Sequence, residues 1–469
     1  MRVGCEAVAF AFVLVFVLLH VVFGLIVPWH GAWGFDVLSF CRVWQIAVFV
    51  VLATCSLGLA HGGAMSRAEA AWAWVGRHLA SLPVRLNPLK THLVIFAVSV
   101  GVLFALGTRY SGGDARWMSG SLPLFLKRSP LASAVLVLGT RLGEAMGLAY
   151  LPSFQATATV VGALSVCGLY QAFLVLFGDK ARAGIFVAAS VASYGVSRLL
   201  PGYIEVYVVF LLFLTVFECA FVRYCLTGRG LAWVLGALFV LLLTHVQALV
   251  VMPGVLAVSA VTCWRKRRVG HFLGLWAGFV VLVVVVYPLL RHRGESYQLL
   301  GEVARLAEGG AVASRFWSTQ AGGHLIAPLN VLLSAGHWAS VANVHVLVSS
   351  IGIALLLCGV AAWWRDGGAD RLVVASVLNY AFFAVGSVLY YNFFQPVVRD
   401  WDMFGAGAVY LLVLAASVWR VAPAAKLRRV FLIVFGVTGL VTLLWLGQQA
   451  GRWGIAPPPA DRVSFAAPG

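Results

Sequence analysis

The sequence predicts an all-α, polytopic membrane protein with about 13 transmembrane helices. Of its 469 residues, 62% are hydrophobic and 10% are charged, whereas a soluble domain has roughly 25% charged residues. Long apolar runs alternate with short connections in which Lys and Arg cluster. A water-soluble core could not bury this much apolar surface, so lipid is the solvent for most of the chain.

Basic connections predict the orientation, because Lys and Arg gather in cytoplasmic loops. They are residues 61–91, 179–182, 223–229, 265–268, 365–371 and 420–429. If all of them are cytoplasmic, an even number of crossings separates each connection from the next. The N-terminus is then inside, and the C-terminus is outside.

The parity rule excludes one apolar run from the spans. Run 131–150 carries Arg141 and Glu144 near its middle, and charges at the centre of a bilayer are costly. It is therefore predicted to be an interfacial helix within an outer loop that covers residues 108–156.

The same rule divides another run into two spans. Run 231–263 is too long for one simple crossing, and basic connections precede and follow it. We therefore expect a tight pair of helices that turns near Thr244 and His245. The other predicted spans are 8–27, 44–60, 92–107, 157–177, 183–200, 203–222, 270–290, 344–363, 371–391, 402–419 and 428–447.

The predicted regions are 1–91, with two N-terminal helices and a cytoplasmic loop; 92–450, the main transmembrane domain; and 451–469, a short disordered tail. The N-terminal apolar run lacks a small-residue cleavage site after it, so it is predicted to be an uncleaved span. A second large outer loop covers 291–343. Within it, residues 294–308 have apolar positions at helical spacing, which indicates a helix on the membrane surface.

Charge and cysteine usage exclude several classes of function. The net charge of +17 is spread over short clusters and forms no continuous stripe, so nucleic acid is not an expected partner. The eight cysteines include no CxxC pair, so neither a disulfide framework nor a zinc site is expected. No Gly-rich phosphate loop is present, which disfavours a nucleotide sugar as substrate.

The unusual polar residues fall on the predicted outer side. They are Asp114, Glu205, His245, His324, Asp400 and Asp402. A carboxylate such as Glu205 at the end of a span needs a partner or a function. Plainer explanations also exist, since Asp114 follows two glycines in a loop and His245 could satisfy a hydrogen bond in its turn.

The strongest local pattern is Arg399-Asp400-Trp401-Asp402. In extended backbone, residues two apart point the same way, so both carboxylates could hold sugar hydroxyls or a divalent cation such as Mg²⁺ or Mn²⁺. Capping of the following helix explains one aspartate but not the whole set. A metal-independent protein is equally compatible with this pattern.

Several motifs, taken together in order, resemble a known superfamily. They are Gly-Asp (113–114), SPL (129–131), GYIEVY (202–207), THVQALVVMP (244–253), GGHLIAPLN (322–330) and RDWDMF (399–404). Over roughly residues 90–450, the chain resembles bacterial integral membrane glycosyltransferases of the GT-C superfamily. It is similar to the polyprenyl-phosphate-dependent branch that includes protein O-mannosyltransferases and the aminoarabinose transferase of lipid A.

The resemblance implies a GT-C-like transmembrane domain in the bacterial cytoplasmic membrane, with the active site on the extracytoplasmic face. An acidic residue in the first outer loop would border a cavity there, and Asp114 matches that position. Many family members have two acidic residues at this point, whereas this chain has Gly113 beside the aspartate. That departure leaves open whether the first loop alone could hold a metal ion.

The implied reaction transfers a sugar from a polyprenyl-phosphate carrier to a hydroxyl of an envelope glycan, lipid or protein. Phosphate leaves as a stable anion, so one base is enough, and Asp114 in that role gives a single inverting displacement. Arg399 is the first candidate to bind the phosphate, since guanidinium groups bind phosphate in bidentate fashion. Other candidates for the phosphate are Arg109, Arg116, Lys127 and Arg128. Candidates for binding sugar hydroxyls, orienting the base or holding a cation are Glu205, His245, His324, Asp400 and Asp402.

Two other functions remain open. A transporter or lipid-linked-sugar flippase places polar residues near the midplane, often in repeated halves. Glu218, inside a span, fits that function best, although its carboxylate could instead snorkel to the inner surface beside Arg223. A non-catalytic partner in an envelope assembly complex would tolerate neutralisation of both Asp114 and Asp402.

Overall fold

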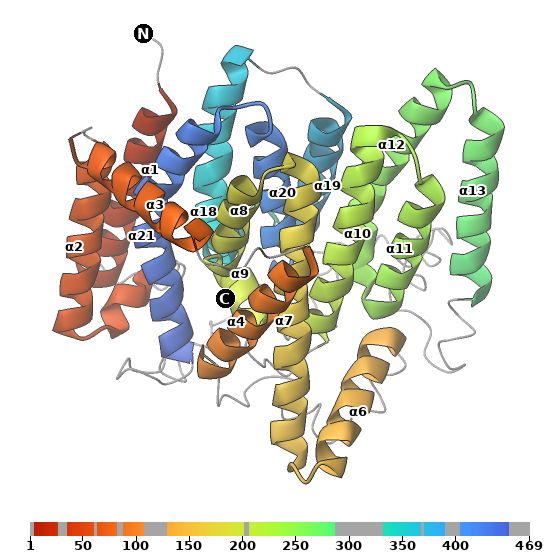
Figure 1. Ribbon diagram of the computed structural model, residues 1–469, viewed down its shortest axis with the longest axis horizontal. Coiled ribbons are helices and arrows are strands. Elements are labelled where there is room, and N and C mark those ends of the chain that lie inside the picture. The colour runs from red at the N-terminus through yellow and green to blue at the C-terminus, as the bar shows by residue number, and fades with distance from the viewer. Residues whose placement is uncertain are drawn as a thin grey trace.

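The computed structural model describes residues 4–26, 35–60, 63–81, 88–106, 129–200, 206–286, 332–366, 370–389 and 404–449. Every regular element within these ranges is a helix. They form a helical bundle (Figure 1). This confirms the all-α class predicted from composition and apolar runs.

Eight described helices are long and apolar enough to cross a membrane, or nine if a bent pair formed by α2 and α3 counts as one span. The eight are Cys5–Ile26, Pro88–Ala105, Tyr150–Phe177, Tyr207–Thr227, Val246–Arg265, Ala335–Trp364, Arg371–Leu389 and Ala424–Gly447. Shorter apolar helices cover Leu231–Thr244, Val269–Val285 and Gly407–Trp419. The chain is therefore built as a membrane-embedded protein.

The N-terminal helices pack beside the last helix of the chain. α1 (Cys5–Val21) and α2 (Val43–Ala60) both contact α21 (Ala424–Gln449). α3 (Gly63–Ser81) turns by 100° from α2 and runs obliquely across the bundle (Figure 1). The predicted cytoplasmic loop 61–91 therefore contains a helix. One face of α3 is apolar enough to pack against α21, and the ring centroids of Trp72 and Phe431 lie 6.3 Å apart.

A helix is present where the interfacial helix was predicted, but part of the predicted outer loop that follows it is also helical. α6 (Pro130–Ala145) turns at Gly147, whose φ of +88° suits glycine, and pairs with α7 (Tyr150–Phe177). Residues 150–156, predicted to belong to the outer loop, are the first turns of α7. The hairpin projects beyond the rest of the bundle (Figure 1). α4 (Pro88–Leu106) packs against the other half of α7, where His92 contacts Tyr170.

The predicted span 183–200 is broken into two helices. α8 (Lys180–Val191) begins after Asp179, whose side chain accepts hydrogen bonds from the backbone N–H groups of Ala181 and Arg182. α9 (Tyr194–Leu199) follows a break at Ser193. The Ser193 hydroxyl lies 2.7 Å from that of Ser349, which marks a kink in α18 (Ala335–Asp366). The break between α8 and α9 thus meets the kink of α18 in the core, and a hydrogen bond between the hydroxyl groups of Ser193 and Ser349 joins the two places.

The predicted tight helix pair is confirmed. α10 (Tyr207–Thr227) leads into α11 (Leu231–Thr244), which stops where His245 adopts an extended backbone, and a 3₁₀ turn, η4 (Val246–Val251), starts α12 (Met252–Arg265). The remaining helices are α13 (Val269–Val281), α19 (Arg371–Leu389) and α20 (Gly407–Trp419). Each span expected from the sequence thus contains a helix in its described residues, and one span is broken into two helices. The predicted surface helix 294–308 lies outside the described residues.

The described parts of connections 179–182, 223–229, 265–268, 365–371 and 420–429 lie at one end of the bundle, the upper end in Figure 1, and α3 of connection 61–91 reaches the same end. Lys266 donates to the Gly228 carbonyl oxygen at 2.7 Å, and Arg371 donates to the Thr262 hydroxyl at 3.2 Å. Arg420 is paired with Asp370 and its carbonyl accepts from Arg182. Arg429 binds Glu69 at 3.0 Å and lies 4.0 Å from Glu6. We call this set of contacts the basic end; it joins connections that the sequence placed on one side of the membrane.

We expect Glu69→Gln to weaken the basic end in a pH-dependent way. The hydrogen bond from Arg429, together with the charges of Arg429 and Arg428, lowers the pKa of Glu69. A lowered folded-state pKa adds stability above the unfolded pKa of about 4.3, and that stability is lost as pH falls through the folded value. Thermal unfolding in detergent should show the variant less stable at neutral pH, by at most about 1 kcal/mol, with the difference vanishing in acid. Equal stability at neutral pH would contradict this expectation.

Candidate functional site

Of the predicted site residues, only His245 falls within the described chain. Asp114, Glu205, His324, Arg399, Asp400, Asp402, Arg109, Arg116, Lys127 and Arg128 lie outside the described residues. The site can therefore be examined through His245 and through the helices that flank the predicted motifs.

His245 occupies the turn between α11 and α12, at the end of the bundle opposite the basic end (Figure 1). Its Nδ1 accepts a hydrogen bond from the backbone N–H of Gln247 at 3.2 Å. Because Nδ1 accepts, the proton of the neutral ring is on Nε2. His245 is thus set up as a hydrogen-bond donor, which suits the binding of a sugar hydroxyl or a phosphate oxygen better than proton abstraction.

Two sequence motifs meet at this histidine. The ring of Tyr207, the last residue of GYIEVY, lies 4.9 Å from the ring of His245 between centroids, and that of Phe210 lies 5.7 Å away. Tyr207 also packs against Leu199 of α9. The end of α9, the start of α10 and the α11–α12 turn therefore form one packed group.

A third motif approaches the same group through α9. A Cβ atom on Gly195 would come within 2.8 Å of the carbonyl oxygen of Gly405, the residue that follows RDWDMF. Phe404, the last residue of that motif, contacts Phe383 of α19 at 6.2 Å. The start of α10 is thus in direct contact with the α11–α12 turn, and the start of α20 adjoins them through α9 and α19. We call the packed ends of α9, α10, α11, α19 and α20 the distal end.

Hydrogen bonds of two histidines join α18 to α19 near the distal end. His345 lies 3.0 Å from the Tyr380 hydroxyl and 2.9 Å from the Ser387 hydroxyl. His337 lies 2.7 Å from the Val388 carbonyl oxygen. These contacts use both ring nitrogens of His345, so its role is to hold α18 against α19. No group of three or more His, Cys, Asp and Glu side chains suited to a metal ion occurs in the described part of the chain.

Arg198 is a residue that the sequence reading missed. Among the described residues, Arg198 and Glu218 are the only Asp, Glu, Lys or Arg side chains that are fully buried, at 1% and 2% exposure. Arg198 lies in α9, three residues before Pro201, which begins the PGYIEVY segment. A signal was available, because an arginine at the outer end of a predicted span runs against the preference of basic residues for the cytoplasmic side.

Comparison with protein-family models, with curated proteins and with solved structures finds no match. The resemblance to GT-C glycosyltransferases therefore stands on the sequence motifs alone. The contact between Tyr207 and His245, and that between Phe404 and Phe383 of α19, are observations independent of that resemblance.

Glu218 lies in the middle of the bundle, apart from the distal end. Its Oε2 and the hydroxyl of Tyr410 are both buried, and neither has a hydrogen-bond partner among the described residues. The alternative that its carboxylate snorkels to the surface beside Arg223 is thus wrong, because Glu218 sits on the face of α10 that packs inward and is 2% exposed.

Proposed function

We propose that the protein is a glycosyltransferase that moves a sugar from a polyprenyl-phosphate carrier to an acceptor hydroxyl. The reaction takes place on the extracytoplasmic face of the bacterial cytoplasmic membrane and inverts the anomeric centre. The observation that carries the proposal is the contact of Tyr207 with His245 at the distal end, opposite the basic end, where α9 and α19 link these residues to the start of α20. Polar groups gathered at one interface suit chemistry on a lipid-linked substrate.

The orientation belongs to the same proposal. The basic end faces the cytoplasm, in accord with the positive-inside preference, and the distal end faces outward. Thirteen spans follow if α11, α13, α20, α2 and the broken α8–α9 helix cross together with the eight longer helices. The N-terminus is then inside, as the pairing of Glu6 with Arg429 at the basic end supports.

The residues have separate roles in this proposal. Asp114 takes the proton of the acceptor hydroxyl while the hydroxyl oxygen attacks the anomeric carbon. The bond to the carrier phosphate breaks with its electron pair, and cationic groups stabilise the departing phosphate. Arg198 joins Arg399 as a candidate for that task, because a buried guanidinium is held in a fixed position. The Nε2–H of His245 donates to a sugar hydroxyl, and Asp400 and Asp402 hold sugar hydroxyls or a divalent cation.

The decisive experiment is sugar transfer by the purified protein in lipid vesicles. Polyprenyl-phosphate sugars are offered as donors together with mixed envelope acceptors, and the consumption of donor and the labelling of acceptor are measured. We expect one donor class to be consumed, with inversion at the anomeric carbon. Movement of a lipid-linked sugar across the bilayer without consumption would instead establish a flippase.

Buried Glu218 is the specific observation that favours the alternative of a transporter or flippase. A carboxyl group in mid-span without a hydrogen-bond partner is expensive, and such groups often mark a transport path. If the protein is a transferase, we expect Glu218→Gln to keep the transfer rate within about twofold. The variant should also unfold at the same or a higher temperature, because a neutral amide costs less to bury than a carboxylate. Loss of substrate movement in Glu218→Gln, with no transfer in wild type, would favour the transporter.

A further inference from the structure

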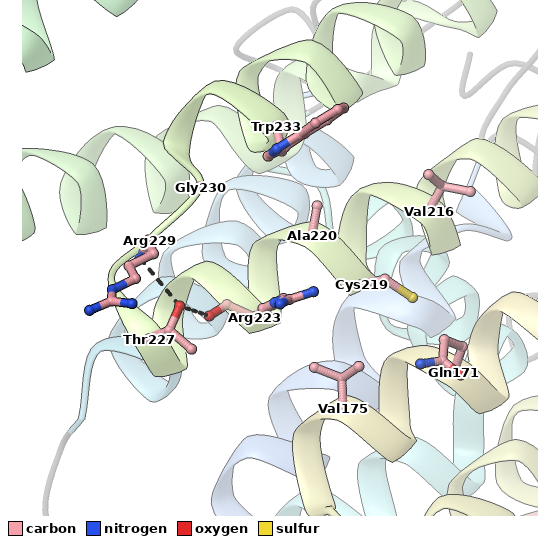
Figure 2. Close-up of a pocket in the computed structure, with 10 residues that line it drawn as sticks. All are labelled: Gln171, Val175, Val216, Cys219, Ala220, Arg223, Thr227, Arg229, Gly230 and Trp233. Carbon is pink, nitrogen blue, oxygen red and sulfur yellow. Dashed lines mark hydrogen bonds between the residues drawn. The ribbon is translucent and has the colours of Figure 1, made fainter. Parts of the chain in front are cut away.

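A groove opens between α7 and α10 and reaches the turn that begins α11 (Figure 2). Its volume is about 850 Å³. The lining residues are Gln171, Val175, Val216, Cys219, Ala220, Arg223, Thr227, Arg229, Gly230 and Trp233. The groove lies beside connection 223–229, at the basic end, and so belongs to a part of the molecule that the proposed sugar transfer does not use.

The charge of the groove is one-sided. Arg223 and Arg229 line it, and none of the other lining residues is charged. Neither guanidinium makes a hydrogen bond or ion pair with another described residue. Figure 2 shows Arg223 directed toward the α7 side of the groove and Arg229 at the turn. The two cations are therefore available to an anion from outside the chain.

The turn at the end of α10 is built so that these arginines stay in place. The Thr227 hydroxyl donates to the Arg223 carbonyl oxygen at 2.8 Å and accepts from the backbone N–H of Arg229 at 3.2 Å. Gly228 and Gly230 have φ values of +63° and +89°, which side chains disfavour. The Gly228 carbonyl is fixed by Lys266 at 2.7 Å. A defined turn thus presents both side chains.

Apart from Gln171 and Thr227, the rest of the groove is lined by apolar residues and is continuous with the outer surface of the bundle. Val216 is 49% exposed, and Val160 and Leu164, farther along α7, are each 42% exposed. Trp233, at the start of α11, is 81% exposed, and tryptophan is enriched at membrane interfaces. An occupant must therefore be amphipathic, with its anionic group at the arginines and its apolar part along the valines.

We propose that this groove binds a membrane phospholipid with a net negative headgroup, from the leaflet on the side of the basic end. Arg223 and Arg229 bind the phosphodiester through charge-assisted hydrogen bonds. The first part of an acyl chain lies along Val175, Val216 and Ala220. Basic pockets between transmembrane helices are suited to such lipids, and the volume fits a headgroup with a short length of chain.

The test compares lipid binding by two double variants of the full-length protein. Delipidated protein in detergent is titrated with phosphatidylglycerol or phosphatidylcholine, and bound lipid is counted by native mass spectrometry. Arg223→Gln with Arg229→Gln should weaken phosphatidylglycerol binding at least about tenfold. Arg265→Gln with Arg268→Gln is the matched control, because it removes the same charge from exposed arginines at the basic end outside the groove. The control should bind within about twofold of wild type.

A second variant and a competition complete the test. Ala220→Phe keeps both arginines but fills the apolar wall, and it should weaken binding as well. Inorganic phosphate in excess should not displace the lipid. Equal losses in both double variants, unchanged binding in Arg223→Gln with Arg229→Gln, equal affinity for the two lipids in wild type, or displacement by phosphate alone would each overturn the proposal. None of these results depends on sugar transfer, so this inference and the proposed function can fail separately.

Discussion

Asp114→Asn is expected to lower the rate of sugar transfer by about 10²- to 10⁴-fold, the range that a positioned general base contributes. A carbon–oxygen bond to phosphate breaks without help from an acid, because phosphate is a stable leaving group. The acceptor hydroxyl, in contrast, must lose its proton as it attacks. Asparagine keeps the size of the side chain and removes the ability to accept that proton. The loss should appear mainly in kcat, with little change in the KM for the donor.

Glu144→Gln is the matched control for this variant. Glu144 is a carboxylate of α6 that pairs with the exposed Arg141 at 3.2 Å, and it has no place in the proposed mechanism. Its transfer rate should stay within about twofold of wild type, since exposed pairs contribute little. If Asp114→Asn transfers sugar as fast as Glu144→Gln and both unfold at the wild-type temperature, Asp114 is not the base.

Gly162→Ala is expected to destabilise the bundle by about 1–3 kcal/mol, the usual cost of overpacking a core. A Cβ atom at Gly162 of α7 would lie 2.5 Å from the carbonyl oxygen of Leu200, at the end of α9. That oxygen belongs to the backbone, so it can move only if α9 moves. Gly162→Val should be worse than alanine. The displacement of α9 should also lower sugar transfer, because Arg198 is in that helix.

Gly184→Ala provides the comparison for Gly162→Ala. Gly184 lies within a helix, in α8, and a Cβ atom there would meet nothing within 4 Å. Helix propensity then favours alanine, so this variant should unfold at the wild-type temperature or above. The measurement is thermal unfolding in detergent with a thiol-reactive dye, since Cys225 and Cys358 are buried until the fold opens. Equal unfolding temperatures for the two glycine variants would contradict the tight contact.

The turn at His245 was predictable because the length of the apolar run and the positions of the basic connections agree. Run 231–263 is too long for one span, and charge parity requires an even number of crossings. The start of α7 was harder, because Pro152 and Gln155 make residues 150–156 look like a loop. Proline is tolerated in the first turn of a helix, where its missing N–H is not needed. The break at Ser193 depends on Ser349, 156 residues away in the chain, so no local pattern reveals it.

The candidate site likewise has parts that the sequence predicts and parts that depend on contacts between distant residues. Charge parity placed His245 and the GYIEVY motif on one side of the membrane, and the contact between Tyr207 and His245 agrees with that placement. The lipid groove was not predictable, because its walls come from two helices whose separation is set by packing. At Gly168, for example, a Cβ atom would clash with the Thr215 hydroxyl oxygen. The sequence shows the glycine but not which helix approaches it.

The contacts of the basic end have a mechanical consequence. They tie α1, α3, α8, α12, α19 and α21 together through side chains and backbone carbonyls at the level of one leaflet. Helices that are held together at one end can separate only at the other end, which here is the distal end. A bulky lipid-linked substrate would therefore enter sideways where the helices splay. The helices at the basic end would meanwhile stay together, so the proposed carrier could enter without separating them.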